Sequence, residues 1–104
     1  MFALEDLADR IAERASASAE KSYTRSLLDK GAKHCARKFG EEAVELIIAA
    51  SAEDDAALRN ETADVLYHLL VVLHARGVPL TDVMDELQRR TARSGHEEKA
   101  ARKP

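Results

Sequence analysis

The chain has 104 residues and a net charge of −3, with 34% charged and 4% aromatic residues. This length allows one domain with a modest core, and a negative charge without a basic, aromatic stripe argues against nucleic acid as a partner. The acidic start (Glu5, Asp6) is unlike a signal peptide, and no apolar run reaches membrane-spanning length. The single cysteine, Cys35, can form no internal disulfide. We therefore expect a soluble, cytoplasmic protein with a buried Cys35 thiol and no membrane partner.

Apolar residues recur at helical spacing along most of the chain, and the composition favours helices. Helices are expected at residues 2–15, 24–31, 32–51, 56–76 and 81–91. The predicted fold class is therefore all-α, with four to five helices per chain in a single domain. Its core is expected at about residues 20–92, followed by a polar, frayed C-terminal tail at 93–104.

Candidate N-cap residues precede three of these helices. Thr24 is expected to cap the short second helix, which should end at Gly31. Asp54 or Asp55 is the candidate for the helix at 56–76, and Thr81 or Asp82 for the last one.

Five acidic residues repeat one spacing on consecutive predicted helices. Glu42 and Glu45 lie one turn apart with Glu41 beside them, and Glu61 and Asp64 repeat the three-residue step. Apolar residues flank both sets, and no lysine or arginine is interleaved among them. Crowded carboxylates on an apolar surface repel one another and lose hydration, which a divalent cation would relieve.

An all-oxygen set of ligands suits Mg²⁺ or Mn²⁺ and not zinc. Ordinary surface glutamates are the simpler interpretation of the first pair alone, but its repetition on the next helix favours a metal site. We expect the metal ligands to be Glu42, Glu45, Glu61 and Asp64.

Two further residues lie near the acids by helical spacing. Lys38 precedes the carboxylates by one turn, which indicates a site that handles phosphate as well as metal. His68 follows Asp64 by one turn and is either a substrate contact or a hydrogen-bonded core histidine.

The helix at 56–76 is apolar around nearly its whole circumference, notably over residues 69–73. A helix of this kind must be buried on all sides, and one small chain has too few helices to surround it. We therefore expect a homodimer whose interface uses this helix.

The acidic pattern resembles the all-α nucleoside-triphosphate pyrophosphohydrolase superfamily, which includes the MazG-like enzymes. Within it, the chain is similar to the phosphoribosyl-ATP pyrophosphatase family over about residues 20–102. The supporting motifs are Ser22-Tyr23-Thr24, Gly31, Lys38-Phe39-Gly40-Glu41-Glu42, Glu61-Thr62-Ala63-Asp64, Tyr67-His68-Leu69-Leu70 and Ser94-Gly95 followed by Glu98-Lys99. The chain departs from the family pattern at His34, where a lysine is usual.

The resemblance implies a MazG-like helical bundle whose core is completed by homodimerisation. It also implies Mg²⁺ as cofactor and hydrolysis of phosphoribosyl-ATP to phosphoribosyl-AMP and pyrophosphate, the second step of histidine biosynthesis. The catalytic residues would be Glu41, Glu42, Glu45, Glu61 and Asp64. The candidate substrate contacts are Tyr23, Thr24, Arg25, Lys33, Lys38 and His68.

Two alternatives remain open at this point. The first is a house-cleaning pyrophosphohydrolase of the same superfamily that acts on noncanonical nucleotides. The second is a non-catalytic helical dimerisation module, in which the acidic residues have only a structural role.

Overall fold

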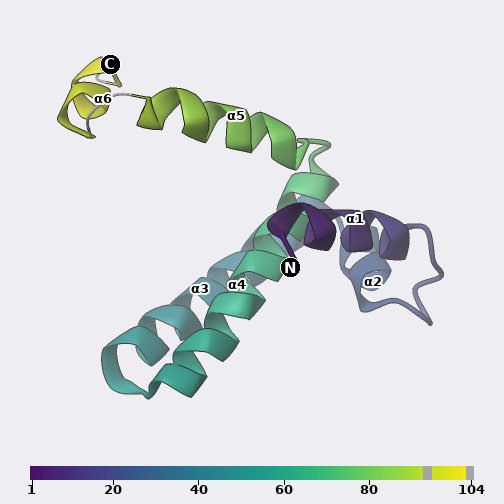
Figure 1. Ribbon diagram of the computed structural model, residues 1–104. Helices are drawn as coiled ribbons and strands as arrows, with labels where there is room; N and C mark the ends of the chain where they lie inside the picture. The colour runs from purple at the N-terminus through teal and green to yellow at the C-terminus, as the bar shows by residue number, and fades with distance from the viewer. Residues whose placement is uncertain (93–94, 103–104) are drawn as a thin grey trace.

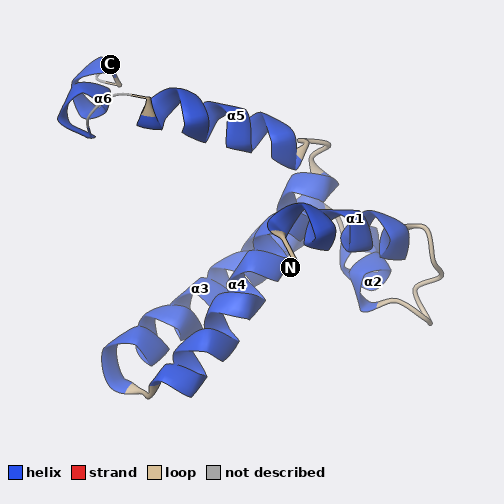
Figure 2. Cartoon of the chain, in the orientation of Figure 1, coloured by secondary structure: helices blue, strands red, loops and turns tan. Residues whose placement is uncertain are grey.

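The computed structural model describes residues 1–92 and 95–102, which form helices and connecting loops (Figures 1 and 2). The helices are α1 (Leu4–Ala15), α2 (Tyr23–Asp29), α3 (Ala32–Ala52), α4 (Asp55–Ala75), α5 (Leu80–Thr91) and α6 (Gly95–Ala101). No strand occurs in these described residues, so the predicted all-α fold class is confirmed.

The two long helices α3 and α4 form an antiparallel hairpin that makes up the body of the molecule (Figure 1). The chain reverses at Glu53 and Asp54, and Asp54 caps α4 by accepting a hydrogen bond from the Ala57 amide at 2.9 Å. A capping side chain satisfies an amide that the first helical turn leaves unpaired. The expected cap at Asp54 is therefore confirmed, and the tight turn aligns the two helices side by side.

Helices α1 and α2 pack against one end of this hairpin and enclose a small core. Cys35 is buried there, and its thiol donates a hydrogen bond to the Leu27 carbonyl at 3.3 Å. Burial raises the pKa of this thiol, which keeps it protonated and unreactive. The fully enclosed apolar residues of the core are Ile11, Leu27, Cys35, Leu70 and Val71.

Two predicted caps are wrong. The cap of α2 is Ser22, whose hydroxyl accepts a hydrogen bond from the Arg25 amide at 3.1 Å, because Thr24 turns inward and is buried. Helix α5 begins after Pro79 without a side-chain cap, so neither Thr81 nor Asp82 has that role. The Asp82 amide instead donates to the Pro79 carbonyl at 3.1 Å, so the backbone satisfies this amide of the first turn without a side-chain cap.

The described residues contain six helices, more than the four to five that the sequence predicted. The extra element is α6, within the stretch that composition alone predicted as a frayed tail. Its sequence is rich in alanine, glutamate and lysine, which all favour helix, and this local preference outweighs the polar composition. Residues 93–94 and 103–104 of the predicted tail lie outside the described residues.

Helix α5 leaves the hairpin at a steep angle, with its axis turned by 111° from that of α4 (Figure 1). It packs on the core of its own chain chiefly through Leu80 at its start. Met84 and Leu87, further along, stay exposed. Glu86 is paired with Arg89 and Arg90, and these two guanidinium groups lower the pKa of its carboxyl to about 2.

No single helix in the described part of the chain is long and apolar enough to cross a bilayer. Helices α4 and α5 reach the required length and composition only when taken together, across the 111° bend.

Substitution of alanine for two of the glycines should change the free energy of unfolding in opposite directions. Gly31 has a φ of +95°, a conformation that disfavours any Cβ, so Gly31→Ala should lower the free energy of unfolding by roughly 1–2 kcal/mol. Gly40 lies within α3, and a Cβ there would meet no atom within 4 Å. Gly40→Ala should therefore raise the free energy of unfolding by up to about 1 kcal/mol. Urea denaturation of both variants measures the two changes, and a loss of stability in Gly40→Ala would contradict the open space beside this residue.

Candidate metal centre

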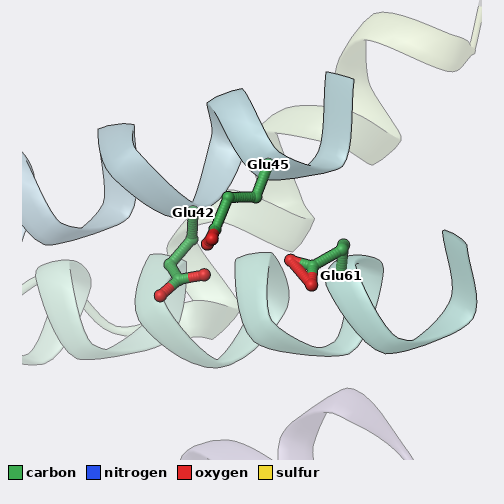
Figure 3. Close-up of side chains that lie close together, drawn as sticks. All are labelled: Glu42, Glu45 and Glu61. Carbon is green, nitrogen blue, oxygen red and sulfur yellow. The ribbon is translucent and has the colours of Figure 1, made fainter. Parts of the chain in front are cut away.

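Three carboxylates converge between the long helices. Glu42 and Glu45 reach down from α3, and Glu61 points toward them from α4 (Figure 3). One oxygen from each lies within 4.8 Å of the others. Their convergence follows from the sequence spacing: one helical turn separates the first two, and the antiparallel hairpin brings the third opposite them. We call these three residues the glutamate trio.

The glutamate trio is electrostatically strained. The Glu42 carboxylate, which lies close enough to share a proton, and the charge of Glu61 raise the pKa of Glu45. One oxygen of Glu61, Oε2, is buried and has no hydrogen-bond partner among the residues that the structure describes. A buried unpaired carboxylate oxygen is unfavourable, and a cation among the three groups would satisfy it. The donor set is all oxygen, so these residues fit Mg²⁺ or Mn²⁺.

Lys38, which precedes the acids by one helical turn, partly compensates their charge. Its Nζ lies 3.5 Å from Oε1 of Glu42 and 3.8 Å from Oε1 of Glu41. Tyr23 is the largest cause of a raised pKa at Lys38, and Glu42 adds to it, so the ammonium stays protonated. One lysine cannot neutralise three carboxylates, so the trio keeps a net negative charge.

Glu41 and Asp64 lie outside the glutamate trio. The Glu41 side chain is 60% exposed, and its only ion pair among the residues described is with Lys38. Asp64 is half-buried, one turn after Glu61 on α4, and its charge acts on His68. The structure therefore brings together three of the four predicted metal ligands, and a ligand role for Asp64 stays a prediction.

His68 is buried beside the glutamate trio. Its Nε2 lies 3.9 Å from Oε1 of Glu42, while its Nδ1 has no hydrogen-bond partner among the described residues. Burial lowers the pKa of His68 and outweighs the Glu42 carboxylate, which acts in the opposite direction. A neutral imidazole at pH 7 is expected, with one nitrogen available as a donor or acceptor toward the site.

Comparisons with known proteins match this chain to one family. The profile described as phosphoribosyl-ATP pyrophosphohydrolase matches residues 4–91, which include the glutamate trio, Asp64 and His68. The chain belongs to this family. It is 60% identical to phosphoribosyl-ATP pyrophosphatase 1 of Bradyrhizobium diazoefficiens, over 98% of this chain and 96% of that protein. It is 62% identical to phosphoribosyl-ATP pyrophosphatase of Azorhizobium caulinodans, over 95% of this chain and 91% of that protein.

Two stacked tyrosine rings, those of Tyr23 and Tyr67, adjoin the trio in this pyrophosphohydrolase-family protein, and we call them the aromatic wall. The exposed ring of Tyr23 stacks on Tyr67, with centroids 6.4 Å apart, and its edge faces His68 at 6.3 Å. Thr24 is buried and shares a hydrogen bond of 2.6 Å with the Tyr67 hydroxyl. In this structure Thr24 therefore positions Tyr67, while Tyr23 is open to a ligand. Tyr67 was not among the predicted site residues, although it belongs to the Tyr67-His68-Leu69-Leu70 motif that supports the family resemblance.

The two remaining candidate contacts of this family member lie apart from the glutamate trio. Arg25 donates from Nε to Asp29 at 2.7 Å and from Nη1 to the Ala15 carbonyl at 2.8 Å, which ties α2 to the end of α1. Lys33 is exposed on the first turn of α3, and no contact of the described residues links it to the trio. Their predicted roles as phosphate contacts have no support from this arrangement and stay predictions.

Proposed function

We propose that this protein hydrolyses phosphoribosyl-ATP to phosphoribosyl-AMP and pyrophosphate in a Mg²⁺-dependent reaction, the second step of histidine biosynthesis. The observation that carries the proposal is the glutamate trio in a member of a pyrophosphohydrolase family. One oxygen of Glu61 is buried there and has no hydrogen-bond partner in the described part of the chain. The relatives' names supply the substrate.

In this proposal the glutamate trio holds Mg²⁺, and Asp64 is the fourth candidate ligand. Bound Mg²⁺ would neutralise charge on the triphosphate and lower the pKa of a coordinated water. Lys38 would contact a phosphate oxygen, because its ammonium lies 3.5 Å from Glu42 and its side chain is 31% exposed.

Hydrolysis forms one P–O bond to water and breaks the bridging P–O bond between the α- and β-phosphates. The electron pair of the broken P–O bond leaves with pyrophosphate. The proton of the attacking water goes to a carboxylate that acts as general base. Glu41 is our candidate for this base, since it lies beside the trio and is exposed enough to meet water. Tyr23 would contact the phosphoribosyl part of the substrate from its exposed ring.

We also propose that the protein is a homodimer. The outer face of the hairpin exposes large apolar side chains that a monomer would leave in water. They are Val44, Ile47, Ile48, Leu66 and Leu69, which are 37–62% exposed. We call this surface the hairpin face, and a second copy of the chain would bury it.

A substrate panel tests the proposed activity. The purified protein is incubated with Mg²⁺ and either phosphoribosyl-ATP, dUTP or dITP, and pyrophosphate release is measured. We expect clear preference for phosphoribosyl-ATP and no release when EDTA removes the metal. Preference for a free nucleotide would indicate a house-cleaning enzyme, and no release from any substrate would favour a non-catalytic module.

A further inference from the structure

A polar cavity of about 350 Å³ is lined in part by Tyr23 and Tyr67 of the aromatic wall. Two basic side chains from the end of α1 and the following loop line it, together with hydroxyl groups. The lining residues are Arg14, Lys21, Ser22, Tyr23, Thr24 and Tyr67. Arg14 and Lys21 have no role in the proposed activity as described above.

Within the described residues, neither a hydrogen bond nor an ion pair engages the side chain of Arg14 or Lys21, although both are exposed. Burial raises the pKa of Tyr67, and the charge of Arg14 acts on that hydroxyl in the opposite direction. Unpaired cations next to hydroxyl donors form a site suited to an anion, and a guanidinium can bind two oxygens of one phosphate.

The cavity and the glutamate trio share one wall. Tyr23 and Tyr67 line the cavity, and both rings also pack against His68, which faces Glu42. Tyr67 follows Glu61 by six residues on α4, so the two lie ~9 Å apart along the helix axis. A ligand held by the trio at one end can therefore extend past the tyrosines into the cavity.

The proposed substrate has phosphate groups at both ends, which ordinary nucleoside triphosphates lack. Its phosphoribosyl group carries a 5-phosphate remote from the triphosphate. We propose that Arg14 and Lys21 bind this 5-phosphate and thereby select phosphoribosyl-ATP over free nucleotides. This inference rests on the proposed function and adds two specificity-determining residues to it.

Kinetics of neutral variants test the subsite. Arg14→Gln and Lys21→Gln should each raise KM for phosphoribosyl-ATP about 10-fold, and the double variant about 100-fold, because each loses a charge-assisted contact. The value of kcat should change less than about threefold, since neither residue touches the reacting phosphates. The matched control is Arg10→Gln, which removes a cation of the same helix that lies over the Phe2 ring and does not line the cavity. Its KM should equal that of the wild type.

A binding experiment separates this inference from the proposed activity. Ribose 5-phosphate is titrated into the wild type and the double variant while the Tyr23 and Tyr67 ring signals are followed by NMR, with ribose as the unphosphorylated control. We expect shifts only for the wild type with ribose 5-phosphate. Unchanged KM in the double variant, or equal shifts with ribose, would overturn the subsite. If the wild type does not hydrolyse phosphoribosyl-ATP, the proposed activity fails, and the titration alone decides whether the cavity binds a sugar phosphate.

Discussion

Glu45→Gln should lower Mg²⁺-dependent pyrophosphate release by about 100-fold or more, while the metal-free protein stays at least as stable as the wild type. Activity should fall because the proposed metal site loses one of its carboxylate ligands. Stability does not fall, because the substitution removes one member of a group of mutually repelling carboxylates. Pyrophosphate release and thermal unfolding, each with and without Mg²⁺, measure the two effects. Mg²⁺ should raise the Tm of the wild type and not that of the variant.

The raised pKa of Glu45 also sets the sign of a pH dependence. The folded, metal-free protein binds this proton more tightly than the unfolded chain does, for which the reference pKa is 4.5. The contribution of Glu45 to stability therefore decreases as pH rises from below 4.5 through the folded pKa. Glu45→Gln should lack this decrease, whereas the control Glu13→Gln, on the exposed side of α1, should behave like the wild type. Full turnover in Glu45→Gln would rule out the proposed metal site.

Ile47→Glu should convert a dimeric wild type into monomers. Ile47 is 62% exposed on the hairpin face, where a partner chain would bury it. Burial of one isoleucine side chain at the interface stabilises the dimer by about 1.5–3 kcal/mol. Burial of a carboxylate in its place destabilises the dimer by more than that. Both effects occur twice in a symmetric dimer. We expect the dimer dissociation constant to rise by at least about 100-fold.

Sedimentation equilibrium measures the oligomeric state of the wild type and the variant. Ile47→Leu is the matched control, because it keeps an apolar side chain of the same size and should remain dimeric. A wild type that sediments as a monomer at all concentrations would contradict the proposed interface.

The helical fold and the grouping of the glutamate trio follow from local spacing. For this reason both could be predicted from the sequence. Glu42 and Glu45 are neighbours on any helix, and a short turn suffices to place Glu61 opposite them. Local spacing alone does not determine whether Asp64 joins the trio. Its spacing matches that of Glu61, but the rotation of α4 against α3 decides which carboxylates meet, and tertiary packing sets that rotation.

The surroundings of the site were harder to predict for the same reason. Thr24 has the residue type of a helix cap, yet packing turned it inward to Tyr67 and left the cap to Ser22. Arg25 is close to the acids in sequence, but its guanidinium bonds the end of α1. Arg14 carries no motif, and only the fold brings it to the wall that it shares with Tyr67.

The projecting arm formed by α5 and α6 has a thermodynamic consequence. Beyond Leu80, α5 buries little apolar surface on its own chain, and an isolated helix of this length is marginal in water. Its Met84 and Leu87 side chains therefore gain burial only against another molecule. Assembly through this arm would therefore raise the helicity of residues 80–91 as protein concentration increases, at fixed temperature and pH.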